Sequence, residues 1–197
     1  MRICLFLLSL IALQGVGSAA NLVVDPGFEN PVLTPWVTGG HTWSLTSSNP
    51  HTGAQGVETG CIGPACVAAD TDPLSAWIFQ DLATTNGSSY DLTFWLGLRK
   101  NPTDPSVNEV KVLWGGAEVF DIQNIVDPAF VQFTVSGLVA SGSTTRLEFF
   151  GRNDPGVVSL DDISVDASAG AVPEPAAFLL LGAGLAGFAR LRRWRIR

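Results

Sequence analysis

Positive charge is scarce in the middle of this 197-residue sequence. Residues 21–171 contain five basic and 17 acidic residues, which gives the segment a net charge of −12 with histidine neutral. The other six basic residues lie near the two ends of the chain, so the overall charge of −7 conceals this division. Such an acidic segment disfavours nucleic acid as a partner and favours solubility or the binding of divalent cations.

Side chains suited to acid–base catalysis are also few, because the sequence contains only two histidines, His41 and His51. Both are flanked by loop-forming residues, and neither lies in a nucleophile, zinc or phosphate-loop motif. Gly39-Gly40 and Gly115-Gly116 lack the following helix and lysine of a phosphate loop, and no spacing of acidic residues singles out a catalytic pair. The sequence therefore predicts a non-enzymatic protein, with a hydrolase as a less favoured alternative.

Helical periodicity is missing between residue 21 and the C-terminal tail. Short runs rich in Val, Phe, Trp and Thr alternate with clusters of Gly, Pro, Asn and Asp, which is typical of an all-β protein. The predicted strands are residues 22–24, 42–46, 76–82, 90–98, 107–114, 117–122, 130–135, 145–150 and 157–165. Mainly local antiparallel connections between these strands favour a two-sheet sandwich.

Three local patterns support this assignment. In residues 90–98 the even positions hold Tyr, Leu and Phe, whereas Trp95 lies on the opposite face of the strand. Gly115-Gly116 suits the tight turn of a hairpin, because glycine accepts a positive φ. The alternation in residues 157–165 breaks at Asp161-Asp162, which indicates a β-bulge that redirects a side chain.

The N-terminus has the features of a secretory signal peptide. Arg2 is followed by an apolar run at residues 3–13 and by Ser18-Ala19-Ala20, so cleavage is expected after Ala20. An uncleaved N-terminal anchor is the alternative.

Two cysteines, Cys61 and Cys66, remain after removal of the signal peptide, which carries Cys4. In an oxidising compartment their spacing favours a local disulfide. A metal site would need more thiols or nearby histidines, and a redox pair would need a Cys-x-x-Cys spacing.

The last 26 residues form a separate signal. Pro173-Glu174-Pro175 is an extended hinge, since proline neither continues a helix nor donates to a sheet. Residues 176–189 are uncharged and mostly apolar, and they precede Arg190, Arg192, Arg193, Arg195 and Arg197. This is a stop-transfer arrangement. Its 14 residues make about 21 Å of helix, short of the roughly 30 Å hydrocarbon core. A buried core helix is therefore the alternative to a membrane helix extended by snorkelling arginines.

The hinge, the Gly/Ala/Leu-rich segment and the arginine cluster together resemble the PEP-CTERM sorting signal of Gram-negative bacteria. The resemblance implies recognition at Pro173, Glu174 and Pro175 by an exosortase, an integral membrane cysteine protease. It also implies export through the inner membrane with removal of the signal peptide by signal peptidase, a transient membrane anchor and final location at the cell surface or outside the cell. Proteins of this kind are typically associated with exopolysaccharide and the biofilm matrix.

A second resemblance covers most of residues 21–166. Asn-Leu-Val-x-x-x-Gly-Phe-Glu at residues 21–29, Tyr-x-Leu-x-Phe-Trp at 90–95 and Leu-Asp-Asp-Ile-x-Val at 160–165 resemble galactose-binding-like jelly rolls. These folds include many carbohydrate-binding modules. The resemblance implies an antiparallel jelly-roll sandwich whose first and last strands lie near each other.

Many members of that fold hold a structural calcium ion between those strands. Carried over by position, Glu29 and Asp161 or Asp162 supply carboxylates, helped by backbone carbonyls around Asp25 and Gly27. Such a mixture of oxygens is what calcium prefers. The alternative is a pair of solvated acids at a strand edge.

Tryptophans are the remaining candidates for ligand binding, because exposed rings stack on sugars. Most tryptophans of a small sandwich are core residues. Trp36, in a proline-flanked loop, and Trp95, opposite the apolar face of its strand, are the best candidates for exposed rings.

The predicted organisation is a signal peptide at 1–20, a β-sandwich at 21–166, a linker at 167–171 and a sorting signal at 172–197. The leading functional prediction is a secreted, non-catalytic component of the envelope or extracellular matrix. The alternative is a specific carbohydrate-binding module.

Overall fold

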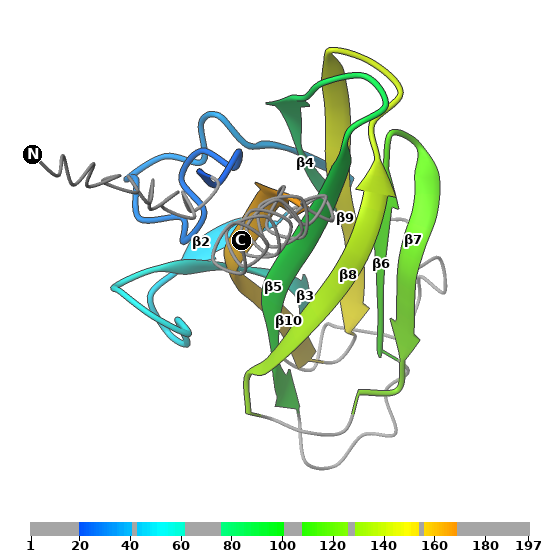
Figure 1. The fold of residues 1–197 in the computed structure, drawn as a ribbon. Coiled ribbons are helices and arrows are strands. Elements are labelled where there is room, and N and C mark those ends of the chain that lie inside the picture. Colours follow the sequence, from blue (N-terminus) through cyan, green and yellow to red (C-terminus); the bar gives the residue numbers. More distant parts are fainter. Residues whose placement is uncertain are drawn as a thin grey trace, which may run out of the picture.

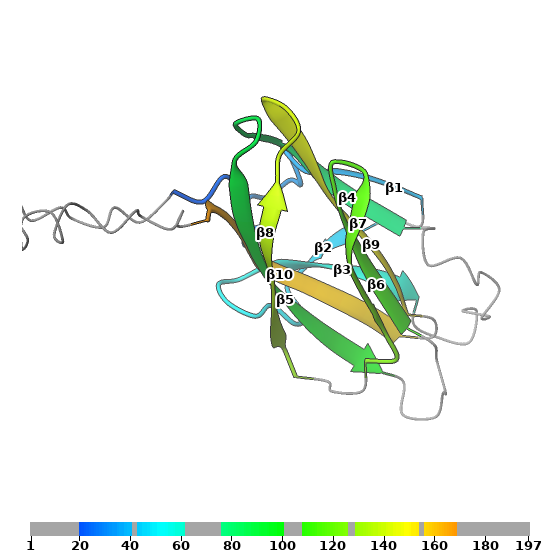
Figure 2. The ribbon, with the colours of Figure 1, turned by 45° about the vertical axis from the view of Figure 1, so that its right-hand side comes forward.

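The computed structural model describes residues 20–40, 43–61, 76–100, 108–125, 129–153 and 156–168. In these ranges the chain forms ten strands in two five-stranded sheets, and the neighbouring strands are antiparallel. The sheets lie face to face in two layers (Figures 1 and 2). The predicted all-β jelly-roll sandwich is therefore confirmed.

The two sheets differ in their strand order. Sheet A has the order β1 (Val37–Gly40), β4 (Ala76–Ala83), β9 (Thr144–Asn153), β6 (Asn108–Trp114) and β7 (Ala117–Gln123). Sheet B has the order β2 (Ser44–Thr46), β3 (Gly56–Cys61), β10 (Gly156–Ala167), β5 (Ser89–Lys100) and β8 (Val131–Val139).

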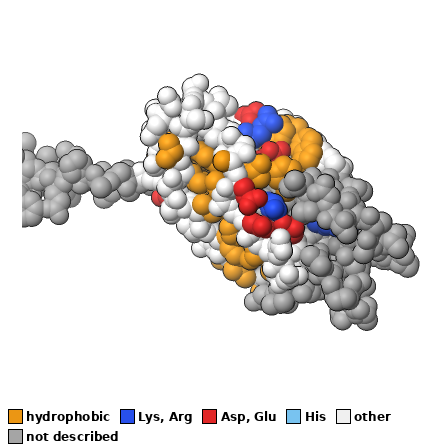
Figure 3. Space-filling model, turned by 90° about the vertical axis from the view of Figure 1, so that its right-hand side faces the viewer, with side chains coloured by type: hydrophobic (Ala, Val, Ile, Leu, Met, Phe, Trp, Pro, Cys, Tyr) orange, Lys and Arg blue, Asp and Glu red, His pale blue; other side chains and the backbone are white. Residues whose placement is uncertain are grey.

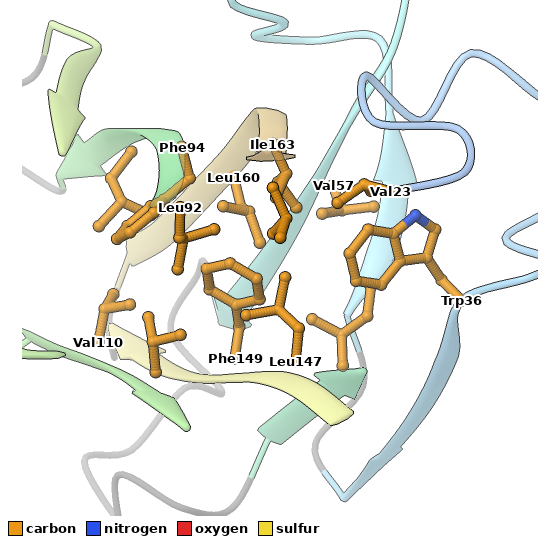
Figure 4. Packing of buried hydrophobic residues seen from close by; sticks show 14 of the residues in the cluster. Val23, Trp36, Val57, Leu92, Phe94, Val110, Leu147, Phe149, Leu160 and Ile163 are labelled. Atoms are coloured by element: carbon orange, nitrogen blue, oxygen red, sulfur yellow. The ribbon is translucent and has the colours of Figure 1, made fainter. Parts of the chain in front are cut away.

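Alternating apolar residues from the two sheets form one core between the layers. On β5 the even positions from Tyr90 to Leu98 are all buried, as the sequence pattern predicts. They meet residues of sheet A such as Leu147, Phe149 and Val110 (Figure 4). Phe94 makes an edge contact with Phe149, with ring centroids 5.3 Å apart. Burial of this apolar surface is the main force that holds the sheets together.

The predicted hairpin and bulge are both present. Gly115 and Gly116 join β6 to β7 with φ values of 59° and 85°. On β10 the register to β5 shifts between Asp161 and Ser164, and Asp162 has a φ of 47°. The bulge therefore lies at the pair of acidic residues where the sequence alternation breaks.

One predicted strand is absent, and two strands of the structure were not predicted. Residues 22–24 are not a strand: Leu22 N–H donates to the Val165 carbonyl, whereas Val24 N–H donates to the Gln80 side chain. The segment still lies beside the end of β10, as Figure 2 shows. In addition, β1 and β3 were not expected, because their glycine-rich sequences contain few apolar residues.

Several predictions fall on residues outside the described ranges. These are the signal peptide, His41, Cys66 and the whole sorting signal with its hinge and arginines. The Cys61–Cys66 disulfide therefore stays a prediction. Among the described residues no helix is long and apolar enough to cross a membrane.

Candidate functional site

The outer face of sheet A, called the A face below, carries aromatic and charged side chains together. On β4, Trp77, Phe79 and Asp81 point outward, because Ala76, Ile78 and Leu82 fill the core. The register of β4 and β9 pairs them with outward residues of β9: Trp77 with Phe150, Phe79 with Glu148 and Asp81 with Arg146.

Three partly exposed rings form an aromatic ledge on the A face: Trp77, Phe79 and Phe150. The Trp77 and Phe79 rings are stacked, with centroids 5.6 Å apart. The indole lies across β1, where a Cβ added to Gly39 would be 2.0 Å from Trp77 Cζ2. Only glycine at this position leaves room for the ring, so Gly39 fixes the place of Trp77.

Arg146 borders the ledge and is held there by two contacts. Its guanidinium carbon lies 3.6 Å from the Phe79 ring centroid, which is a cation–π geometry. Its Nε and Nη2 donate to the two carboxylate oxygens of Asp81 at 2.8 and 3.1 Å. Hydrogen bonding from Arg146 lowers the pKa of Asp81, so both charges of the pair persist at neutral pH.

Lys111 on β6 is surrounded by acidic side chains. Its ammonium lies 3.2 Å from a carboxylate oxygen of Glu109, 3.4 Å from Glu118 and 3.6 Å from Asp121. These contacts, with the Glu109 hydrogen bond first, raise the pKa of Lys111. Figure 3 views the molecule from the side of β6 and β7 and shows hydrophobic side chains beside acidic ones gathered around basic ones.

Glu148 differs from the other acids of the A face, because its side chain has neither a hydrogen bond nor an ion pair with a described residue. It is half-buried between Phe79 and Leu113, its neighbours on β4 and β6. Burial raises the pKa of Glu148, and the nearby Arg146 charge acts in the opposite direction. The centre of the A face therefore holds a partly desolvated carboxylate that no other residue of the described ranges engages by a hydrogen bond or an ion pair.

Trp95 lies on the outer face of sheet B, called the B face below, and the prediction of its orientation is correct. Its ring is not free, however, because His51 stacks on it with centroids 3.9 Å apart and an interplanar angle of 18°. Phe130 also packs here: its ring centroid is 5.2 Å from that of His51, and its ring lies beside Gly97. Trp95 is half-buried as a result.

Trp36 is buried rather than exposed, with 4% of its surface accessible. Its ring packs on Phe28 at 5.2 Å, and its indole N–H donates to the Asp25 carbonyl at 3.1 Å. The prediction that this proline-flanked tryptophan is exposed is therefore wrong. The loop folds inward because it closes one end of the core.

The predicted acidic residues Glu29, Asp161 and Asp162 do come together at the junction of the chain ends. All three surround Gly27: a Cβ added there would be 3.4 Å from Asp162 Oδ1, 3.6 Å from Asp161 Oδ1 and 3.9 Å from Glu29 Cγ. The conformation of the bulge and the N-terminal turns creates this cluster.

Each of these carboxylates already accepts hydrogen bonds from the loop that precedes β3. Asp161 Oδ2 accepts from the backbone N–H of His51 at 2.7 Å, and Glu29 Oε1 accepts from Ala54 N–H at 2.8 Å. Asp162 Oδ2 lies 2.6 Å from His51 Nδ1. Asp161 is fully buried, so the alternative of solvated acids does not apply to it. Burial raises the pKa of Asp161, against the effect of its backbone donors.

The fit of a cation to this cluster is mixed. Within the described ranges, no group of three or more His, Cys, Asp or Glu residues is arranged to hold a metal ion. Yet Asp25 Oδ2 is buried without a hydrogen-bond partner, while Oδ1 of the same side chain accepts from Glu29 and Asn30 N–H. An unpartnered buried carboxylate oxygen is the kind of ligand that a cation would use. The calcium site stays a prediction.

Trp77 is one of the tryptophan candidates in the sequence, but it was not chosen as an exposed ring, although the signal was available. In residues 76–82 the even positions are Ala, Ile, Gln and Leu, and all four are buried. That alternation places Trp77 and Phe79 outward in the same way that it places Trp95. The alternation along a strand predicts which rings point outward, but it does not predict which of these rings is covered by another segment of the chain.

The C-terminal tail matches the PEP-CTERM protein-sorting motif over residues 171–193. The chain therefore carries this sorting motif, as predicted from its hinge, apolar segment and arginines. The motif implies secretion and a C-terminal sorting signal anchored in the membrane.

The sandwich is similar in fold to carbohydrate-binding modules. TmCBM61, solved with β-1,4-galactotriose, aligns with a TM-score of 0.55 and 16% identity over 76% of this chain and 99% of its own. The CBM22-1 xylan-binding domain of Paenibacillus barcinonensis Xyn10C aligns equally well, over 76% and 96%.

The K3 adhesin domain of Lys-gingipain from Porphyromonas gingivalis W83 aligns with a TM-score of 0.55 and 14% identity, over 77% of this chain and 100% of its own. At such identities the likeness establishes the fold alone. A comparison with curated proteins finds no match.

Proposed function

We propose that this protein is an exported carbohydrate-binding protein whose A face takes the sugar. The observation that carries the proposal is the aromatic ledge of Trp77, Phe79 and Phe150 on the outside of a jelly-roll sheet. One of the similar folds is described in complex with β-1,4-galactotriose, and another is described as xylan-binding. The predicted alternative of a carbohydrate-binding module thus becomes the preferred function.

The ledge has the chemistry that sugar recognition requires. A partly exposed indole offers a flat apolar surface to the C–H face of a pyranose ring, and it loses little conformational freedom on binding. Glu148 and the Arg146–Asp81 pair stand beside the rings and offer acceptors and donors to hydroxyl groups. Gly39 leaves room for the indole against β1, and Phe79 packs beside it. A ring ordered by this packing before a ligand arrives has a lower entropic cost of binding.

The sorting motif indicates where such binding would be used. An exosortase substrate is exported, held briefly at the membrane and then released or transferred, so its sandwich would meet polysaccharide at the cell surface or outside the cell. We therefore propose a role in the envelope or the exopolysaccharide matrix. If processing occurs at the hinge, mass spectrometry of secreted protein should find a C-terminus near Pro175 and no intact Arg197. Secreted protein that ends at Arg197 would contradict the processing step.

A passive matrix component is the rival function, because a jelly roll need not bind anything. The two are separated by measuring oligosaccharide affinity with isothermal titration calorimetry for the wild type, Trp77→Ala and Trp95→Ala. We expect Trp77→Ala to weaken binding at least about tenfold, with folding preserved because the ring is partly exposed. Trp95→Ala is the matched control, and it should bind as the wild type does.

Equal losses for both variants would show that the A face is not the site. A broad panel of neutral, acidic and amino polysaccharides without any binder would favour the passive component.

We also propose a structural calcium ion at the junction of the N-terminal segment and β10. The supporting observation is the buried, unpartnered Oδ2 of Asp25 near a cluster of carboxylates. Glu29, Asp161 and Asp162 would contribute oxygens, with backbone carbonyls around Asp25 and Gly27. A cation there would offset the repulsion between these acids and tie both ends of the sandwich together.

A further inference from the structure

Glu148 occupies the central position on the A face. It belongs to β9, the middle strand of sheet A, and its cross-strand neighbours are Phe79 and Leu113. The next outward residues along β9 are Arg146 and Phe150. A ligand stacked on the aromatic ledge would therefore have Glu148 within reach of its polar groups.

Two cations near Glu148, Arg146 and Lys111, are already engaged by acidic side chains. Arg146 is bound to Asp81 through two hydrogen bonds, and Lys111 is shared by Glu109, Glu118 and Asp121. Neither cation is available to an anionic ligand without loss of these contacts. The side chain of Glu148, in contrast, makes no hydrogen bond or ion pair to the described residues.

From this arrangement we infer that the polysaccharide bound by the A face carries free amino groups, as glucosamine-type sugars do, and that Glu148 pairs with the ammonium. The inference rests on the proposed function, because it concerns the same face. It names the class of sugar and the residue that selects it.

Two physical effects favour an ammonium group at this place. A charge-assisted hydrogen bond to a half-buried carboxylate is stronger than one between neutral groups. The negative face of an aromatic ring also attracts a cation. Arg146 already lies over Phe79, so Trp77 is the ring that would add attraction to the ammonium.

The same charges oppose an acidic sugar. A uronic acid would meet Glu148, whose neighbour Arg146 is already paired with Asp81, on a segment of net charge −12. A neutral sugar can donate a hydroxyl to Glu148, so it should bind, but with lower affinity. The expected order is amino sugar, neutral sugar and acidic sugar.

The test compares pairs of oligosaccharides of several linkages that differ only in N-acetylation, with calorimetry on the full-length chain. The free-amine form should bind roughly tenfold more tightly than the N-acetylated form, the effect expected of one charge-assisted hydrogen bond. Glu148→Gln should remove this preference and still bind the N-acetylated form. Glu118→Gln, the same change at the edge strand β7, is the matched control and should keep the preference.

The pH dependence gives a second readout. Because burial raises the pKa of Glu148, its charge is lost at a higher pH than that of an ordinary glutamate as acid is added. The amine stays protonated, so the preference for the free-amine form should decline over that range in the wild type. In Glu148→Gln no such decline is expected.

The failure of this inference differs from the failure of the proposed function. If N-acetylated or acidic sugars bind through Trp77 and the free-amine forms gain nothing, Glu148 does not select an ammonium. An equal loss of preference in Glu148→Gln and Glu118→Gln would assign the effect to overall charge and also overturn the inference. If no sugar of any class binds, the proposed function itself is wrong.

Discussion

The A face and the B face each carry an outward-pointing tryptophan, Trp77 on β4 and Trp95 on β5, but the surroundings of the two rings differ. Trp77 lies over Gly39 and beside Phe79, with polar groups along its border. Trp95 lies under His51, which the loop before β3 brings to it. Both rings are half-buried, but His51 already occupies one side of the Trp95 ring, whereas Phe79 is the aromatic partner of Trp77 among the described residues. We therefore assign ligand stacking to Trp77 and internal packing to Trp95.

The loop that covers the B face depends on Asp161, and its removal should have the largest effect on stability. Asp161 is fully buried and accepts N–H groups of His51, Thr52 and Asp162. Asp161→Asn would turn an amide NH₂ toward at least one of these donors. We expect a loss of about 2–3 kcal/mol in the free energy of unfolding, measured by urea denaturation.

Asp121→Asn on the edge of the A face is the control for Asp161→Asn and should change stability by less than about 0.5 kcal/mol. If the two variants are equally stable, the loop before β3 is not held by Asp161, and the contrast between the two faces loses its structural cause.

A bound calcium ion would further stabilise the junction of the N-terminal segment, the loop before β3 and β10. If the ion binds, chelation should lower the melting temperature, with a stabilisation of about 2.7 kcal/mol at a hundredfold excess of calcium over its Kd. Glu29→Ala should remove the response to chelator. Asp161→Ala is less informative, because loss of its hydrogen bonds destabilises the protein with or without calcium. A melting curve that chelator does not move, in protein saturated with calcium beforehand, would rule the site out.

Some elements of the two sheets can be predicted from the sequence, and others cannot. The alternation in residues 90–98, the glycine pair at 115–116 and the break at Asp161-Asp162 predict the central strand, the hairpin and the bulge, because each rests on local backbone and burial rules. The glycine-rich β1 and β3 carry little such signal.

The covering of Trp95 by His51 and the burial of Trp36 depend on contacts between distant segments. Asp162 and His51 are 111 residues apart in the chain, and no local pattern connects them. The same applies to Gly39 beneath Trp77, whose importance is visible only when β1 is placed beside β4. The sequence predicted the outward orientation of Trp95. Which face offers a ring for ligand binding could be judged only from the packing of distant segments.

Gly39 offers a way to disturb the A face without touching a polar group. In Gly39→Ala the new methyl would overlap the Trp77 ring, so the indole must move. Because β1 is an edge strand, the sheet should tolerate the change. We expect roughly tenfold weaker sugar binding, measured by calorimetry, with an unfolding transition close to that of the wild type. Unchanged affinity would mean that the position of Trp77 does not matter.

The smallest effect is expected at the border of the ledge. Asp81→Asn removes one partner of an exposed ion pair, so stability should fall by less than about 1 kcal/mol. The hydrogen bond from Arg146 lowers the pKa of Asp81, so the contribution of the pair is present at neutral pH and is lost as the pH falls through that lowered pKa. Denaturation of the wild type and Asp81→Asn at several pH values measures it. A difference that grows on acidification would contradict the assignment.

Sugar contact with the A face is the central claim, and it is tested most directly by observing the tryptophans themselves. The protein is labelled with fluorotryptophan, its ¹⁹F signals are assigned by single Trp→Phe variants, and a bound oligosaccharide is titrated in. The account predicts that the Trp77 signal shifts in step with occupancy, whereas the Trp95 and Trp36 signals stay in place. A titration that moves Trp95 and leaves Trp77 unchanged would place the ligand on the B face and contradict the account.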